Sequence, residues 1–186
     1  MSRWKKKRSI MKHYDLTANI YDMQYAEEQT AKIEATLKNI KFYDGGFVLD
    51  VGCGTGLLFK YVADKVQTTV GLDISRKTLL QAKKRAKAFT NIHLVLADAD
   101  HMPFKEAIFS HVFAVTLLQN MPNPNKTLKE IMSVASENAV IVVTGLKKVF
   151  PLEDFKKLLR NSGLKIVDLI DDSSLKCYAA VCTKLS

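Results

Sequence analysis

The segment that decides the fold is FVLDVGCGTG at residues 47–56, where an apolar run ends in three glycines at alternate positions. Val48, Leu49 and Val51 give this run the character of a buried β-strand. Because glycine has no Cβ, the turn at residues 52–56 can bring backbone N–H groups and a helix start close to a ligand. The segment therefore predicts a strand, a ligand-binding turn and a helix, in that order.

The spacing of the glycines limits the kind of ligand. A dinucleotide site has the pattern G-x-G-x-x-G, whereas this turn reads G-x-G-x-G and lacks the Gly-Lys-Ser/Thr of a phosphate-binding loop. Asp50 precedes the turn, and its carboxylate would repel a pyrophosphate and attract an ammonium group. We therefore expect a ligand with little or no phosphate at this turn.

Beyond the turn, short β-branched runs alternate with helical periods. Strands are predicted at residues 46–51, 68–73, 92–97, 109–115, 138–144, 165–170 and 175–183. Helices are predicted at about residues 56–66, 75–88, 124–135 and 152–162. This alternation is typical of an α/β fold with a mostly parallel sheet and helices on both faces. Only DDSS joins the last two strands, so these two are expected to pair antiparallel.

Polar side chains follow consecutive strand ends in this scheme. They are Asp73 after the second strand, Asp98 and Asp100 after the third, and Thr116, Gln119 and Asn120 after the fourth. The carboxyl ends of parallel strands meet at one edge of an open α/β sheet, which is where such sheets bind ligands. One acid at a strand end is usually a helix cap or a solvated loop residue. The whole series predicts a site in which Asp73 accepts ribose hydroxyls and Asp98 and Asp100 reach a base.

The charge of the chain is concentrated at its start. The net charge is +9, and residues 1–12 contain six cations and no acid. We expect these twelve residues to form a flexible basic tail, which either binds RNA, with Trp4 available for stacking, or is simply solvated. A second basic run at residues 76–87 fits the solvated face of a helix.

Several classes of protein and site are not supported by the composition. Cys53, Cys177 and Cys182 are an odd number without paired spacing, which favours a reducing compartment over a disulfide framework. The histidines and cysteines lack the spacing of metal ligands, so no metal site is expected. No stretch has the roughly 18–20 apolar residues of a membrane span, and the basic start lacks the apolar core of a secretory signal. We expect a cytoplasmic protein.

These motifs resemble the class I S-adenosylmethionine-dependent methyltransferases, and most closely the methyltransferase type 11 group that includes ubiquinone and menaquinone biosynthesis enzymes. The resemblance rests on VLDVGCGTG (48–56), VGLDIS (70–75), LADADHMPF (96–104) and VTLLQNMPNP (115–124). It implies a Rossmann-like sheet of seven strands in the order 3-2-1-4-5-7-6, with strand 7 reversed. It also implies one methyltransferase domain over residues 13–186, with a helical lid at 13–45 and a core at 46–186.

The resemblance further implies which residues bind the cofactor, S-adenosylmethionine. They are Asp50, Gly52, Cys53, Gly54, Gly56, Asp73, Ile74, Asp98, Ala99, Thr116, Leu117 and Tyr21. The lid would close Tyr14 and Tyr21 over the cofactor, although ordinary helix packing would explain these tyrosines equally simply. Tyr14 is also a candidate for the substrate side, and Gln119 and Asn120 are expected either to contact the substrate or to cap the following loop.

The methyl acceptor is left open by the sequence, and no catalytic residue can be named. An N-P-P-Y motif, used on planar nitrogens, is absent at 119–122, which reads QNMP. The favoured hypothesis is a macromolecular acceptor, RNA above all, with a small zinc-binding activator protein on the edge strand 92–97. A small quinone- or lipid-like acceptor is the first alternative, and a non-catalytic, cofactor-binding scaffold is the second.

Overall fold

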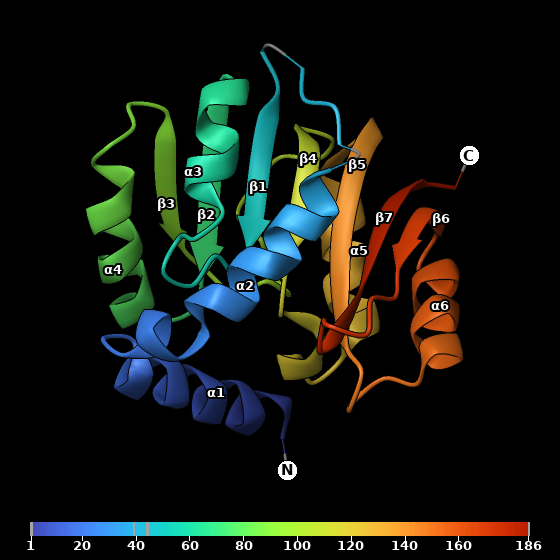
Figure 1. The fold of residues 1–186 in the computed structure, drawn as a ribbon, viewed down its shortest axis with the longest axis horizontal. Coiled ribbons are helices and arrows are strands. Elements are labelled where there is room, and N and C mark those ends of the chain that lie inside the picture. The colour runs from blue at the N-terminus through green and yellow to red at the C-terminus, as the bar shows by residue number, and fades with distance from the viewer. Residues whose placement is uncertain (1, 39, 44, 186) are drawn as a thin grey trace.

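The computed structural model describes residues 2–38, 40–43 and 45–185, and its centre is a seven-stranded sheet (Figure 1). The strand order is β3-β2-β1-β4-β5-β7-β6. The strands are β1 (Phe47–Val51), β2 (Thr68–Asp73), β3 (Ile92–Leu96), β4 (Phe109–Ala114), β5 (Ala135–Leu146), β6 (Leu164–Ile170) and β7 (Cys177–Lys184). Strand β7 runs antiparallel to β5 and β6, and the other neighbours pair in parallel. The predicted fold class, strand order and reversed strand are confirmed.

Strand β1 lies inside the sheet, and its side chains alternate between two apolar layers. Val48 packs with Ile33 and Val62 on one face, whereas Leu49 packs with Leu128 on the other. This alternation is what the two-residue period of a strand requires. Both layers are fully buried around β1, so the polar ends of the strands are fixed by the core beneath them.

Helices cover both faces of the sheet, as predicted. The helices α2 (Tyr21–Leu37), α3 (Phe59–Val62) and α4 (Arg76–Ala86) pack on one face, and α5 (Pro124–Val134) and α6 (Leu152–Asn161) pack on the other. Figure 1 shows α2 and α3 in front of the sheet and α5 behind it. Two short 3-10 turns, η1 (Ala63–Lys65) and η2 (Leu118–Asn120), follow α3 and β4. In the described part of the chain, none of the helices combines the length and apolar character that crossing a membrane requires.

The sequence locates the helix starts well. Ser75 precedes α4, and its Oγ accepts a hydrogen bond from the Thr78 amide at 3.2 Å. Asn123 precedes α5 and accepts from the Lys126 amide at 3.4 Å, while Pro124 occupies the first helical position. The helix predicted at 56–66 is shorter than expected, because the glycine turn extends to residue 58 before α3 begins.

The start of the chain differs from the expectation of a flexible tail over residues 1–12. Residues Arg3–Thr17 form one helix, α1, which crosses below the carboxyl ends of the strands (Figure 1). Its inner side includes Lys7, which is 7% exposed and pairs with two acids of the core. A run of cations with no acid nearby looks like a tail in the sequence, but here it is anchored by acids far along the chain.

Candidate cofactor-binding site

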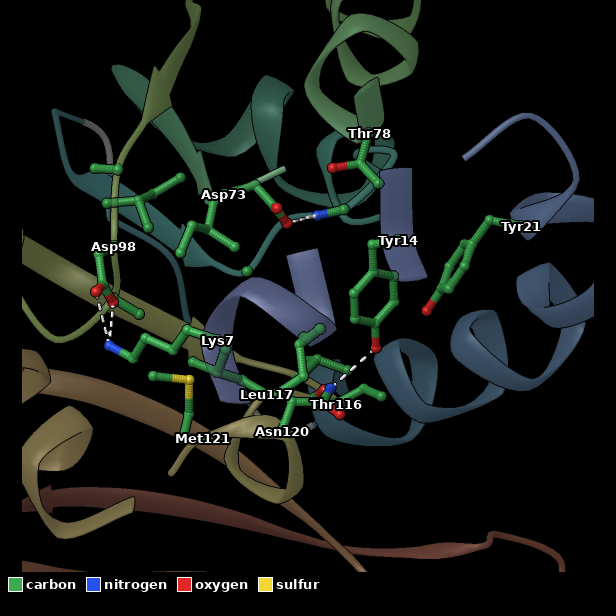
Figure 2. A pocket seen from close by; sticks show the side chains of 18 residues that line it. Lys7, Tyr14, Tyr21, Asp73, Thr78, Asp98, Thr116, Leu117, Asn120 and Met121 are labelled. Atoms are coloured by element: carbon green, nitrogen blue, oxygen red, sulfur yellow. Dashed lines mark hydrogen bonds and ion pairs between the residues drawn. The ribbon is translucent and has the colours of Figure 1, made fainter. Parts of the chain in front are cut away.

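A cavity lies between the carboxyl ends of β1, β2, β3 and β4 and helix α1, which forms its roof (Figure 2). The predicted residues that line it are Tyr14, Tyr21, Gly52, Gly54, Asp73, Ile74, Asp98, Ala99, Thr116, Leu117 and Asn120. A second cavity adjoins the first, since both are lined by Tyr21, Gly52 and Gly54. The second cavity adds Asp50 and Cys53. The structure therefore brings most of the predicted residues around one space.

Three predicted residues, Gly56, Asp100 and Gln119, line neither of these cavities. Gly56 has a φ of 80°, and a Cβ at this position would lie 2.4 Å from the ring of Phe59. Its lack of a side chain thus serves the packing of α3 rather than the approach of a ligand. Gln119 lies in η2, and its Oε1 is buried without a hydrogen-bond partner among the described residues.

Gly54 faces the cavity. Its φ is 54°, and no atom lies within 4 Å of the position where a Cβ would stand. Its amide donates a hydrogen bond of 2.9 Å to Asp73 Oδ2. The turn is also joined to β2 by the amides of Gly52 and Cys53, which donate to the Leu72 carbonyl at 2.7 and 2.9 Å. The glycine turn is therefore fixed in place and open on the side where a ligand can lie.

Asp73 ends β2 and faces the centre of the cavity. Its Oδ1 accepts from the Ser75 amide at 2.8 Å, and its Oδ2 accepts from the Gly54 amide. Burial raises the pKa of this carboxyl, while the amide hydrogen bonds act in the opposite direction. The Ile74 backbone and the Thr78 side chain also hydrogen-bond to this carboxyl group, so the side chain is fixed at the edge of the cavity.

Asp50 is a buried acid that pairs with no cation among the described residues. It is 4% exposed, and no hydrogen bond to its carboxyl group is found among the described residues. Burial, with the neighbouring charge of Asp73 as a second cause, raises the pKa of Asp50 to about 8. Burial destabilises the ionised form of this carboxyl group, and a positively charged ligand beside it would stabilise that form.

Asp98, at the end of β3, is engaged by the roof of the cavity. Lys7 Nζ lies 2.5 Å from Asp98 Oδ1 and 2.7 Å from Oδ2, and it also lies 2.5 Å from Asp100 Oδ2 (Figure 2). Asp100 was expected to face a bound base, but it instead accepts a 2.6 Å bond from Thr127 Oγ1 of α5. Of these two acids, Asp98 lines the cavity, and its carboxylate forms an ion pair with Lys7.

Thr116, just after β4, has an unusual backbone. Its φ of 60° is in the left-handed region, which a β-branched residue rarely adopts. Four hydrogen bonds hold Thr116 in this conformation. Its amide donates to Thr144 Oγ1 and its hydroxyl donates to Gln29 Oε1, both at 2.7 Å. Its carbonyl accepts from Asn120, and its hydroxyl accepts from Lys32. Strain that is fixed by several neighbours is characteristic of a ligand-binding position.

The roof of the cavity contains two tyrosines. Asn120 Nδ2 donates a 2.9 Å hydrogen bond to Tyr14 Oη, and the rings of Tyr14 and Tyr21 lie 6.0 Å apart between centroids (Figure 2). Burial raises the pKa of both phenols, so both stay neutral at physiological pH.

The start of α2 is joined to the glycine turn by Asp22, whose carboxylate accepts from Thr55 Oγ1 at 2.6 Å and from Arg85 at 2.9 Å.

Sequence reasoning missed several residues of this arrangement. Lys7 was assigned to a tail and Arg85 to a solvated helix face, and Asp22, Thr55 and Thr144 were assigned no role. Their partners lie between 28 and 91 residues away, so no local pattern marks them. Within the described ranges, no group of three or more histidine, cysteine, aspartate or glutamate side chains could hold a metal ion.

Comparison with known proteins identifies the family. Residues 49–143 match the Methyltransf_11 family, described as a methyltransferase domain. The chain is 32% identical over 157 residues to an uncharacterized protein of Methanocaldococcus jannaschii, covering 84% of this chain and 58% of that protein. It is 33% identical over 138 residues to demethylmenaquinone methyltransferase of Staphylococcus haemolyticus, covering 72% and 56%. The chain thus spans a little over half the length of these relatives.

Solved structures share the fold. A SAM-dependent methyltransferase from Aquifex aeolicus has a TM-score of 0.79 at 16% identity, covering 91% of this chain and 98% of that chain. A methyltransferase of Haloferax volcanii, solved in complex with the Trm112 methyltransferase activator, has a TM-score of 0.75 at 15% identity, covering 93% and 98%. The family match, which spans just over half of the chain, and the shared fold agree. The chain belongs to the class I S-adenosylmethionine-dependent methyltransferases of the Methyltransf_11 family.

Proposed function

We propose that this chain transfers the methyl group of S-adenosylmethionine to a small, quinone- or lipid-like acceptor. The observation that supports a small acceptor is the position of α1, which covers the cavity with Lys7, Ile10 and Tyr14. The sequence had favoured RNA, and it predicted a flexible basic tail over residues 1–12 that could bind it. With α1 folded over the cavity, the small-molecule alternative is the better supported, and the named relative acts on demethylmenaquinone.

The residues of the two cavities suit S-adenosylmethionine. This cofactor has an α-ammonium group and a sulfonium, and Asp50 is a buried acid with no cationic partner in the part of the chain that the structure describes. Gly54 leaves open space beside the turn, where the methionine part of the cofactor would lie. Asp73 lines the cavity at the end of β2 and would accept the ribose hydroxyls. Asp50, Gly54 and Asp73 therefore form the proposed centre of the cofactor site.

The base of the cofactor would bind at the end of β3. Asp98 would accept a hydrogen bond from the exocyclic amine of adenine, and the Ala99 amide would donate to the ring. Lys7 now holds the same carboxylate of Asp98. Adenine binding therefore requires the ammonium group of Lys7 to move away from Asp98.

The cofactor supplies an activated methyl group, so the protein mainly has to align donor and acceptor. Such orientation contributes about 7–11 kcal/mol to lowering a barrier. Tyr14 and Tyr21 are neutral phenols in the roof, and their rings can contact a sulfonium and exclude water. Thr116 and Leu117 line the cavity beside them and would position the acceptor. We assign no general base.

The experiment that tests this proposal follows a radiolabelled methyl group. The protein is incubated with labelled S-adenosylmethionine and, separately, with lipid, protein and RNA fractions of a cell extract. We expect label in the lipid fraction and none with the Asp73→Ala variant. Label in RNA alone would show that the macromolecular hypothesis is correct. Tight cofactor binding without transfer to any fraction would show that the chain is a scaffold.

A macromolecular acceptor with an activator subunit is the second candidate, and one feature favours it. Strand β3 is an edge of the sheet, and Leu96 on it is 57% exposed. An exposed edge strand can pair with a strand of a partner, and the Haloferax volcanii neighbour was solved with an activator. Leu96→Lys should abolish co-purification with such a partner. Unchanged co-purification would exclude this edge as the docking place.

A further inference from the structure

The two helices that contain the basic runs of the sequence are in contact in the structure. Helix α1 contains the first and α4 the second, and polar contacts join the α1–α2 corner to α4 (Figure 1). Asp15 accepts hydrogen bonds from Ser75 Oγ at 2.6 Å and from the Lys77 amide at 3.2 Å. Asn19 accepts one from Gln81 at 2.7 Å. We call the exposed side chains of residues 3–23 and 76–87, on these two joined helices, the α1–α4 face.

The α1–α4 face is strongly cationic. Five exposed lysines and arginines lie within residues 3–12, and five more lie within residues 76–87. The acids in these ranges, Asp15 and Asp22, are both half-buried and accept hydrogen bonds from α4 or the glycine turn. The positive charge of the face is therefore offset by no fully exposed acid of its own.

Large apolar side chains are exposed among these cations. Leu16 is 81% exposed and Met23 is 88% exposed, with the exposed Ile20 between them in the sequence at the α1–α2 corner. Trp4 on α1 and Leu80 on α4 are also exposed. Aliphatic side chains with this much surface in water gain free energy when a partner covers them.

We infer that the α1–α4 face docks on an anionic lipid membrane. Helices that lie in a membrane interface combine cations, which contact anionic headgroups, with apolar side chains that enter the acyl boundary. RNA would also attract the cations, but single-stranded nucleic acid gains its remaining affinity by stacking on aromatic rings. The corner presents the aliphatic residues Leu16, Ile20 and Met23, which suit acyl chains better than bases.

This docking would bring the cavity to the bilayer. The inner side of α1 lines the cavity with Lys7, Ile10 and Tyr14, and its outer side belongs to the α1–α4 face. An acceptor leaving the bilayer at the α1–α2 corner would therefore enter beside the roof. The part of this inference that identifies the acceptor as a lipid from the membrane rests on the proposed function. The docking itself can be measured without any methyl donor.

Co-sedimentation of the full chain with vesicles tests the docking. Wild type should bind equimolar phosphatidylglycerol and phosphatidylcholine vesicles at least about tenfold more tightly than phosphatidylcholine alone. The double variant Leu16→Ser, Met23→Ser should lose at least about tenfold in affinity, because two exposed apolar anchors are removed. Val167→Ser is the matched control, since Val167 is exposed on β6 at the far edge of the sheet. Circular dichroism checks that each variant is folded.

Charge reversal tests the headgroup contacts separately. Lys83→Glu with Lys84→Glu on α4 should weaken binding to the mixed vesicles at least about tenfold, and high salt should weaken wild type in the same way. The control pair is Lys157→Glu with Lys165→Glu, at exposed positions of α6 and β6. Equal binding to both vesicle types, or equal effects of variants and controls, would overturn the inference.

Two further measurements separate this inference from its alternatives. Retention of RNA by wild type, with no retention of vesicles, would identify the α1–α4 face as a nucleic-acid surface and refute membrane docking. Methylation of a water-soluble acceptor analogue measures the proposed function independently. Turnover without vesicle binding would contradict only the docking, whereas vesicle binding without turnover on any acceptor would contradict only the proposed function.

Discussion

The floor of the cavity is the glycine turn at residues 52–56 with the ends of β1 and β2, and the roof is helix α1 with the start of α2. These two parts are held by different kinds of contact. In the floor, the amides of Gly52 and Cys53 donate to the Leu72 carbonyl, so the glycine turn is part of the hydrogen bonding between β1 and β2. In the roof, Lys7 of α1 pairs with Asp98, 91 residues further along the chain. Backbone bonds between buried strands hold the floor, and a small number of side-chain contacts hold the roof.

This difference implies separate stabilities for the two parts. The floor cannot move without breaking the core of the sheet, because Leu49, Val51 and Leu72 beneath it are fully buried. The roof can detach when a few polar contacts break, and such elements open at lower free energy than the core unfolds. We therefore expect the floor to be formed before the cofactor arrives and the roof to open for its entry. The predictions below test this division, from the largest expected effect to the smallest.

The largest effect is expected in the floor at Gly56. Gly56→Ala adds a Cβ that lies 2.4 Å from the buried ring of Phe59, at a φ of 80°. Urea denaturation should show a loss of about 3 kcal/mol in the free energy of unfolding. Gly54→Ala is the matched control, because its Cβ would meet open space, and it should lose only about 1 kcal/mol. Equal losses would show that Phe59 gives way and that packing does not require Gly56.

The pH dependence of cofactor affinity should report the state of Asp50. With its pKa raised to about 8, Asp50 is protonated in the free protein below that pH and must lose its proton to pair with an ammonium group. Affinity measured by calorimetry should therefore rise by up to about tenfold per pH unit between about pH 6 and pH 8. Asp50→Asn should bind more weakly and show a flat profile. A flat wild-type profile would contradict the pairing.

The same shift has a consequence for stability without the cofactor. The pKa of Asp50 is raised from 3.8 to about 8, so the folded protein binds this proton more tightly than the unfolded chain does. The contribution of Asp50 to the free energy of unfolding is therefore lost as pH rises from about 4 to about 8. Thermal unfolding of Asp50→Asn should lack this decline, and an equal decline in both proteins would assign it to other groups.

A smaller loss is expected from Asp73→Ala. Removing this carboxylate takes away the proposed ribose acceptor and leaves the Gly54 amide without its partner. Cofactor affinity should fall at least about tenfold, which corresponds to about 1.4 kcal/mol. Asp64→Ala, an exposed position in η1, should leave the affinity unchanged. Equal affinity of Asp73→Ala and wild type would refute the ribose assignment.

The smallest effect is expected in the roof. Lys7→Met removes the cation that occupies Asp98, so α1 should open more often and adenine should meet less competition. Stopped-flow measurements should show severalfold faster association of the cofactor, and limited trypsin digestion should cut α1 sooner. Lys6→Met changes an exposed lysine one position earlier and should change neither rate. Slower association in Lys7→Met would mean that Lys7 assists cofactor binding instead of blocking it.

The same division explains how much could be predicted from the sequence. The floor was predictable because its function is encoded locally: glycines at alternate positions end a buried strand, and Asp73 and Asp98 end the next two. The antiparallel pairing of β6 and β7 followed from the short link between them, whereas the strand order followed from the resemblance to the family. Gly56 was assigned to the ligand, since a glycine that faces a ring looks the same in the sequence as one that faces a cavity.

The roof was only partly predictable. Tyr14 and Tyr21 were expected in a lid, and they line the cavity. Lys7 was not expected there, because a lysine among six cations resembles a solvated residue until Asp98 and Asp100 are placed beside it. Partners separated by 91 residues are brought together by the fold, and no spacing rule in a single sequence identifies them.

Trp4, exposed on α1, is the only tryptophan in the chain. Its intrinsic fluorescence therefore comes from the roof alone, with no background from the sheet. A shift of its emission to shorter wavelength would mark transfer of α1 into an apolar surrounding, and a change in its anisotropy would follow the opening of this helix in real time. The molecule thus contains its own optical reporter for the part that moves, and no dye is needed to watch it.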